Sequence, residues 1–211
     1  GGSATVHFPI WHQEIEDILV LKNNKGTEDN RVRKLDYSIQ ISELFYKRFI
    51  NDEDVSLFSP HDVDNLYDVY GSPEFDTLYE KYERNKKIPR KTIGAQKLFM
   101  ELLKERAETG RIYIMNIDHC NTHSSFKDKV YMSNLCQEIT LPTKPVQHID
   151  DPEGEIALCI LSAINLGMIK DKEELEELCD LSVRALDEII DYQEYPVEAA
   201  KKSTEARRSL G

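Results

Sequence analysis

Apolar residues recur along the first part of the chain with two different spacings. Alternating or continuous apolar runs predict strands at residues 4–10, 55–60 and 111–118. Spacings of three and four residues predict amphipathic helices at residues 11–22, 37–49 and 90–109. The turn letters NNKG end the first helix, and Gly110 is well placed to end the last one. Residues 61–87 are polar and rich in tyrosine, and we expect helical pieces there, with Pro73 at a helix start or break.

The second part of the chain has a different pattern. Residues 136–143, with the letters CQEITLPT, predict a strand or an extended loop, and residues 155–167 form an apolar run typical of a fully buried strand. Residues 171–193 predict a long helix whose core-facing side contains Leu175, Leu178, Ala185, Leu186 and Ile189. Strands separated by helices indicate an α/β architecture. The sequence contains no internal repeat or low-complexity segment.

Composition and charge narrow the possible partners. The 211 residues, 40% of them hydrophobic, are enough for one good core. A net charge of -12 would repel a phosphate backbone over most of the surface, and the basic clusters RVRK, RNKKIPRK and KKSTEARR lie among acids or beside predicted helix ends. No apolar run is long enough to cross a bilayer, and the first residues lack the pattern of a signal peptide. We therefore expect a cytoplasmic protein that binds neither nucleic acid nor membrane.

The four cysteines are too few and too widely spaced for the disulfide framework of a small secreted domain. In a reducing compartment we expect free thiols unless catalysis oxidises them. Cys179 lies in the long predicted helix, where we expect a buried, small apolar side chain. The letters DHCNTH place Asp118, His119, Cys120 and His123 in a ligand-like cluster, but no second ligand pair has suitable spacing for structural zinc. We favour structural packing for this cluster and predict no metal site.

One short stretch, SNLCQEITLPT, places Asn134, Cys136 and Glu138 at every second position. In an extended segment these side chains point the same way, with neighbours about 6 to 7 Å apart. A carboxylate near a thiol can act as a general base on a hydroxyl, and an amide can donate to one oxygen and accept from another. The alternative is an edge strand with a polar outer face and an incidental cysteine. The spacing alone favours that alternative, because any half-buried strand alternates in this way.

Longer blocks of sequence add a family resemblance. SNLCQEITLPTKP, followed by GEIALCILSAINLG with Cys159, closely resembles the catalytic subunit of class I ribonucleotide reductases, the large chain of the aerobic ribonucleoside-diphosphate reductases. NRVRKLDYSIQ, LFSPHDV, ERAETGRIYIMNIDHCNTHS and ALDEIIDYQEYPVEAAK resemble further blocks of that family in the same order. The resemblance covers essentially the whole chain. It implies an oxidoreductase that makes deoxyribonucleotides by thiyl-radical chemistry.

The resemblance implies a role for each member of the stretch. Cys136 matches the cysteine that becomes a thiyl radical and takes the 3′ hydrogen from the substrate ribose. Glu138 matches the carboxylate that accepts the 3′-hydroxyl proton, and Asn134 matches the amide that holds the sugar hydroxyls. Cys159 matches one of the two cysteines that supply reducing equivalents and end as a disulfide. Convergence of three groups on one ribose requires a curved loop rather than a flat strand.

The resemblance also implies a fold and partners. The family fold is a ten-stranded α/β barrel in which an internal finger loop carries the radical cysteine. Residues 1–211 would be an incomplete central segment of that barrel. The second reducing cysteine and the effector-binding segment would precede it, and the phosphate loop, a tyrosine pair and a cysteine-bearing tail would follow it.

The implied partners are a ribonucleoside diphosphate, the rest of the alpha chain, a second alpha chain, a small beta subunit whose metal centre supplies the radical, and thioredoxin or glutaredoxin. The segment itself is expected to bind no cofactor directly, and the ATP and dNTP effectors are expected to bind mainly outside it. A second hypothesis stays open at this point. The chain would then be a catalytically silent fragment acting as a structural or interaction module.

Overall fold

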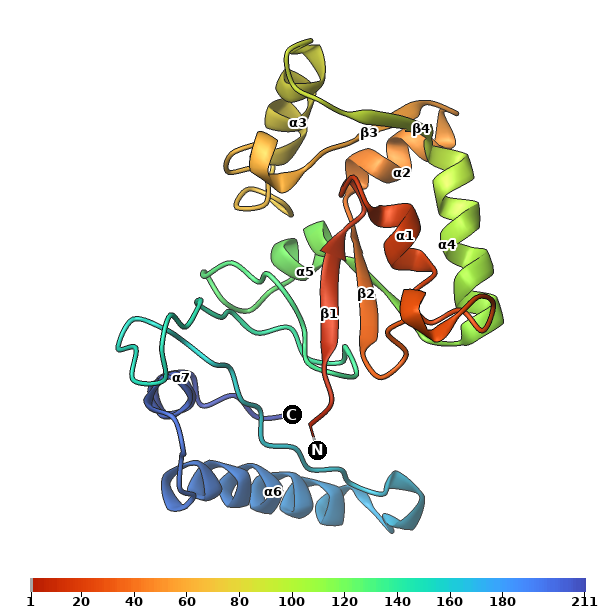
Figure 1. Ribbon diagram of the computed structural model, residues 1–211. Coiled ribbons are helices and arrows are strands. Elements are labelled where there is room, and N and C mark those ends of the chain that lie inside the picture. The colour runs from red at the N-terminus through yellow and green to blue at the C-terminus, as the bar shows by residue number, and fades with distance from the viewer. Residues whose placement is uncertain (1) are drawn as a thin grey trace. The chain divides into compact units, whose positions relative to one another are not determined.

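A computed structural model describes residues 2–211, which form two compact units (Figure 1). The first unit extends to Thr140, and the second runs from Leu141 to Gly211. No helix among the described residues is both long enough and apolar enough to cross a membrane.

A parallel sheet of three strands forms the centre of the first unit. The strand order is β1 (Thr5–Pro9), β2 (Asp36–Ile41) and β5 (Ile112–Asn116), and Phe8, Ile39 and Ile114 stand side by side in the register. Parallel neighbours need crossover connections. The connection from β1 to β2 contains α1 (Ile15–Leu19) and a short 3-10 turn, η1 (Glu28–Asn30). The connection from β2 to β5 is much longer and includes α2 (Glu43–Ile50) and α4 (Ala95–Thr109).

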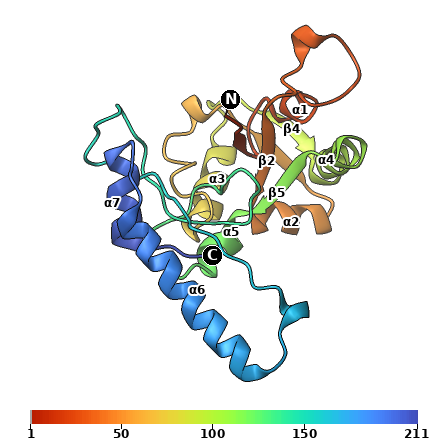
Figure 2. The ribbon, with the colours of Figure 1, turned by 90° about the horizontal axis from the view of Figure 1, so that it is seen from below.

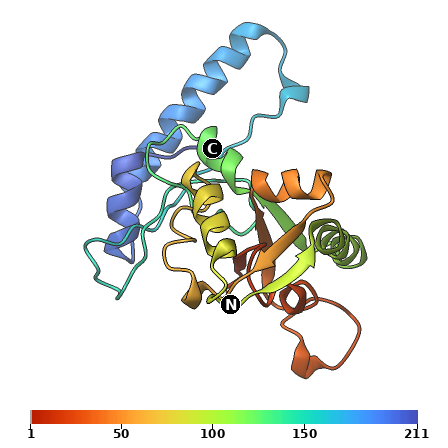
Figure 3. The ribbon, with the colours of Figure 1, turned by 90° about the horizontal axis from the view of Figure 1, so that it is seen from above.

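The two faces of this sheet pack differently. Tyr37, Ile39 and Ile41 of β2 belong to one hydrophobic cluster with apolar side chains of α1 and α4. Figures 2 and 3 show α1, α2 and α4 gathered on one side of the strands and α3 on the other. The alternate residues of β2, Ser38 and Gln40, therefore point to the opposite face, yet they too are fully buried.

A second hydrophobic cluster, rich in aromatic side chains, includes Phe75 and Tyr79 of α3 (Glu74–Arg84) and Ile117 of α5 (Ile117–Thr122). The antiparallel pair β3 (Asp54–Leu57) and β4 (Lys91–Gly94) contributes Val55, Leu57 and Ile93 to the first cluster, and the turn η2 (Pro60–Asp62) follows β3. Tyr79 of α3 ties helix to strand, because its hydroxyl accepts from the Ser56 amide at 2.8 Å and donates to the Ser56 carbonyl at 2.7 Å.

The structure confirms the three predicted strands of the first part and changes all three of its helices. The helix predicted over 11–22 is shorter, because α1 covers only Ile15–Leu19. Residues 36–41 form a strand where a helix over 37–49 was predicted, and the helix begins only at Glu43. The Ser42 hydroxyl caps it by accepting from the Phe45 amide at 3.4 Å. The helix predicted over 90–109 likewise begins after β4, and it ends at Gly110, whose φ of 64° is left-handed. The predicted helix start at Pro73 is confirmed.

The second unit is largely helical. It contains η3 (Leu166–Met168), α6 (Lys172–Tyr192) and α7 (Glu198–Arg207), and the carboxylate of Asp171 caps α6 by accepting from the Glu174 amide at 2.8 Å. The predicted long helix is confirmed, but its predicted core side is wrong in part. Leu186 is buried, whereas Ile189 is 43% exposed.

The buried strand predicted over 155–167 is also wrong. This stretch makes only isolated bridges, from Glu155 to Lys144 and from Ile160 to Leu210. Leu161 and Leu166 are exposed. An apolar run forms a strand only where a neighbouring strand completes its backbone hydrogen bonds, and among the described residues of this unit no strand is paired with it.

Candidate functional site

The segment that carries Cys136 lies on the polar face of the parallel sheet. Each strand of the sheet holds it through a hydrogen bond. On β1, the Thr5 hydroxyl donates to the Leu135 carbonyl at 2.6 Å. On β2, the Ser38 hydroxyl donates to Gln137 Oε1 at 2.8 Å, and Gln40 Nε2 donates to the Tyr131 carbonyl. On β5, the Ile114 carbonyl accepts from Gln137 Nε2 at 2.9 Å. His7 Nε2 lies 3.2 Å from the Ser133 carbonyl, and burial lowers the pKa of this imidazole. The segment is thus fixed by polar side chains at regular positions on β1 and β2.

The segment closes into a turn around Cys136. The Gln137 amide donates to the Asn134 carbonyl at 3.2 Å, and the Asn134 amide donates to the Ile139 carbonyl at 3.3 Å. Gln137 has a φ of 65°, which lies in the left-handed region that residues other than glycine rarely adopt. Residues 136–143 contain no strand, so the strand alternative is wrong and the loop alternative is confirmed.

The three candidate side chains of the turn differ in their exposure to solvent. Cys136 and Glu138 are exposed, and Asn134 is half-buried. The side-chain carbonyl oxygen of Asn134 accepts from the Ile139 amide at 3.0 Å and from the Ser133 hydroxyl at 3.2 Å. Because that oxygen is used inside the turn, the NH2 group of Asn134 is the part that can serve a ligand, as a donor. The Cys136 thiol and the Glu138 carboxylate are thus exposed, while the backbone around them is held by hydrogen bonds within the turn and to the sheet.

Cys159 belongs to the second unit, where it is half-buried. It precedes the bridge between Ile160 and Leu210. A Cβ atom added to Gly211 would lie only 3.2 Å from the Cys159 sulfur, so the end of the described chain passes directly beside this thiol. Cys179, expected to be buried, is instead exposed on α6 because it lies outside the buried stripe of that helix.

The DHCNTH cluster forms α5 and has structural contacts. The Asp118 carboxylate accepts from the Glu43 amide at the start of α2, and burial raises the pKa of Asp118. The Asn121 side chain accepts from the Val130 amide at 2.9 Å and donates to its carbonyl at 3.0 Å. Burial raises the pKa of the Cys120 thiol. Within residues 2–211, no group of three or more His, Cys, Asp and Glu side chains is arranged to hold a metal ion.

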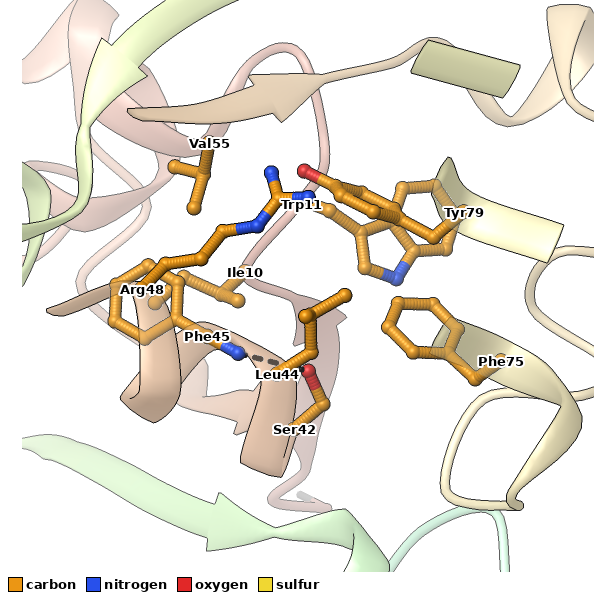
Figure 4. A pocket seen from close by; sticks show the side chains of 9 residues that line it. All are labelled: Ile10, Trp11, Ser42, Leu44, Phe45, Arg48, Val55, Phe75 and Tyr79. Atoms are coloured by element: carbon orange, nitrogen blue, oxygen red, sulfur yellow. Dashed lines mark hydrogen bonds between the residues drawn. The ribbon is translucent and has the colours of Figure 1, made fainter. Parts of the chain in front are cut away.

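One cavity borders the Cys136 turn and α5, and another lies between α2 and α3. The first, a shallow one of about 310 Å³, lies at the carboxyl end of β5, lined by Ile114, Met115, Asn116, His119, Cys120, His123, Gln137 and Thr140. Ligands of parallel α/β sheets bind at this edge of the strands. The other, drawn in Figure 4, is enclosed by Trp11, Phe75, Tyr79, Arg48 and their neighbours. Its volume of about 10 Å³ has room for at most one water molecule, so it is a packing gap.

A sequence model of the ribonucleotide reductase barrel domain matches residues 1–211. The chain belongs to the ribonucleotide reductase family. It is 58% identical over its whole length to the ribonucleoside-diphosphate reductase subunit alpha of Buchnera aphidicola from Schizaphis graminum, and it covers 28% of that protein. The corresponding identities are 54% to the ribonucleoside-diphosphate reductase 1 subunit alpha of Escherichia coli and 44% to the ribonucleoside-diphosphate reductase subunit alpha of phage T4, each with 28% of the relative covered.

Membership in the ribonucleotide reductase family confirms the resemblance seen in the sequence. The mixed α/β architecture is confirmed as well. The chain spans about 28% of the length of these relatives. Two of the contacts to the segment that carries Cys136, which were missed from the sequence, come from Ser38 and Gln40 of β2. Ser38 and Gln40 alternate with the apolar residues Tyr37, Ile39 and Ile41, a pattern that indicates a strand with one polar face. This pattern was overlooked because a helix was predicted over the same residues.

Proposed function

We propose that this chain is the part of a ribonucleoside-diphosphate reductase alpha subunit that carries the radical cysteine, Cys136. Within the complete subunit it reduces ribonucleoside diphosphates to deoxyribonucleotides in the cytoplasm. The observation that carries the proposal is the turn itself, which exposes Cys136 and Glu138 on a backbone tied to every strand of a parallel sheet. The match to the barrel domain over residues 1–211 supports it.

The turn supports the acid–base part of the reaction directly. A thiyl radical on Cys136 takes the hydrogen atom from C3′, so that the C–H bond breaks and an S–H bond forms. After the reduction this hydrogen atom returns to C3′, which re-forms the C–H bond and restores the thiyl radical. The Glu138 carboxylate accepts the 3′-hydroxyl proton, and the Asn134 NH2 group donates to a sugar hydroxyl. All three groups come from one closed turn, so binding the ribose there converts their encounters into steps within one complex.

The reduction uses the thiol chemistry of Cys159. Cys159 and a second cysteine elsewhere in the subunit give up two electrons and two protons and form a disulfide, while the 2′ hydroxyl leaves as water. Thioredoxin or glutaredoxin then restores the two thiols by exchange. The initial radical comes from the metal centre of the small beta subunit, and the ATP and dNTP effectors bind mainly outside this segment.

The proposed fold extends the sheet seen in the first unit. The parallel strands β1, β2 and β5 form part of a ten-stranded α/β barrel, which the remaining alpha chain completes, and the Cys136 turn is the finger inside it. The complete subunit works as an alpha homodimer. Residues 1–211 are then a central segment of one barrel domain.

The test uses the complete alpha subunit with its small subunit. Cys136→Ser should abolish deoxynucleotide formation while leaving nucleotide binding nearly intact, because oxygen at this position cannot perform the hydrogen-atom chemistry of sulfur. Cys179→Ser, at an exposed position on α6, is the matched control and should retain full turnover. Measurable turnover by Cys136→Ser contradicts the proposal.

A further inference from the structure

Gln137 stands between the two exposed groups of the turn, but its side chain is used differently from theirs. Its Oε1 accepts from the Ser38 hydroxyl at 2.8 Å, and its Nε2 donates to the Ile114 carbonyl at 2.9 Å. Both ends of the amide are therefore engaged, one with β2 and the other with β5. Ser38 is fully buried, so its hydroxyl has a fixed position from which to donate.

The backbone of Gln137 indicates that these bonds hold a strained conformation. A φ of 65° is uncommon for a residue with a side chain, and such conformations persist where the surroundings determine them strongly. Three hydrogen bonds hold the Gln137 backbone in this conformation. Two are made by its side chain, and in the third its backbone amide donates to the Asn134 carbonyl at 3.2 Å. Neither bond of its side chain involves the exposed thiol or carboxylate beside it.

The position of Gln137 gives it direct control over both neighbours. Cys136 and Glu138 are joined to it by peptide bonds, which are planar and stiff. A rotation of the backbone at residue 137 therefore moves the thiol and the carboxylate relative to each other. A misplacement of about 1 Å is enough to lower a reaction rate on the order of 100-fold.

We infer that Gln137 is a positioning residue, which clamps the Cys136 turn to β2 and β5 and so sets the relative placement of the thiol and the carboxylate. This inference rests on the proposed function. It assigns no contact with substrate to Gln137. The amide acts through Cys136 and Glu138, and Ser38 acts through Gln137.

The experiment compares variants of the complete alpha subunit assayed with its small subunit. Gln137→Met keeps the length of the side chain and removes both bonds, and Ser38→Ala removes one of them from the strand side. Gln96→Met is the matched control, because Gln96 Nε2 also donates to a backbone carbonyl, that of Phe49 at 3.1 Å, at an exposed site on α4.

Gln137→Met should lower kcat by about 100-fold with little change in KM, and the control should leave both unchanged. Ser38→Ala should lower kcat less. The double variant should resemble Gln137→Met rather than the product of the two losses, because both changes break the same contact. A purely structural role would instead lower the unfolding temperature and leave kcat of the folded enzyme unchanged.

Hydrogen exchange tests the clamp without activity. The amides of Gln137 and Ile139 should lose protection in Gln137→Met and keep it in Gln96→Met. A kcat of Gln137→Met within about twofold of the parent, or unchanged protection in the turn, overturns the inference. The two proposals fail separately, because an inactive parent subunit contradicts the proposed function, whereas an active parent with an equally active Gln137→Met contradicts the positioning role alone.

Discussion

Removing Arg48 should destabilise the first unit more than any surface charge does. Its guanidinium on α2 binds the Glu83 carboxylate on α3 through two bonds of 2.6 Å each. The side chains are only 12% and 18% exposed. The guanidinium carbon also lies 5.1 Å from the centre of the Tyr79 ring, and the hydrogen bonds that Arg48 donates to Glu83 raise the pKa of Arg48. Arg48→Met fills much of the same space but leaves the mostly buried Glu83 carboxylate without its partner.

The size of the effect follows from that burial. Breaking a buried ion pair by removing one partner costs about 3 to 5 kcal/mol, and the remaining exposure of this pair places Arg48→Met near the lower end of that range. Glu83→Leu, which leaves the arginine unpaired, should have a similar cost. The double variant Arg48→Met with Glu83→Leu should recover most of the loss, because replacing both charges by apolar groups is often neutral.

Urea unfolding of the 211-residue chain measures these free energies. Its single tryptophan, Trp11, is 3% exposed and lies in the same hydrophobic cluster as Tyr79, so its fluorescence reports on this region. Arg84→Met is the control on α3, the helix that carries Glu83, because Arg84 pairs with Glu80 at 2.7 Å with side chains 76% and 41% exposed. That change should cost less than about 0.5 kcal/mol. The reasoning is refuted if Arg48→Met costs no more than the control, or if the double variant loses the sum of the two single losses.

Three further predictions concern the second cysteine, the isolated chain and one lysine. Cys159→Ser in the complete enzyme should block turnover driven by thioredoxin, whereas Cys120→Ser should not; loss of activity in the latter would give DHCNTH a functional role. The 211-residue chain mixed with small subunit, substrate and dithiothreitol should yield no deoxynucleotide, and product would show that it holds a whole active site. Burial lowers the pKa of Lys129 from 10.5 to about 8. The unfolded chain then binds more protons between these values, so the unfolding free energy should rise with pH across this window, and Lys129→Met should flatten that rise.

The sequence predicted the elements whose pattern is set by their own neighbours. The helix at α6, the strand at β5, and the Gly110 end of α4 all follow from local periodicity and local backbone preference. The strand at β2 was missed because Tyr37, Ile41, Leu44 and Phe45 also fit a helical spacing. Only the partners on both sides, β1 and β5, decide between the two patterns, and they are distant in sequence.

The residue types of the candidate site stand out in the sequence, but the contacts that hold them in place do not. Asn134, Cys136 and Glu138 stand out as residue types, and the family blocks around them suggest their roles. The left-handed backbone of Gln137 and its bond to Ser38 depend on a contact across 99 positions of the chain, which no local pattern encodes. The apolar run at 155–167 failed for the same reason, since a strand needs a partner that the run itself does not specify.

One face of β2 packs in the hydrophobic core, and the other contacts the segment that carries Cys136. At Ser38 and Gln40, the residue that favours stability therefore differs from the residue that favours activity. Ser38 and Gln40 are buried polar residues in the middle of a strand that is enclosed on both sides, where β-branched apolar residues pack best. A library selected only for resistance to heat should enrich valine or isoleucine at these positions. A library selected for deoxynucleotide synthesis should keep Ser38 and Gln40, because their side chains hydrogen-bond the segment that carries Cys136. Comparing the two selections would therefore separate, within one strand of six residues, what the fold requires from what the chemistry requires.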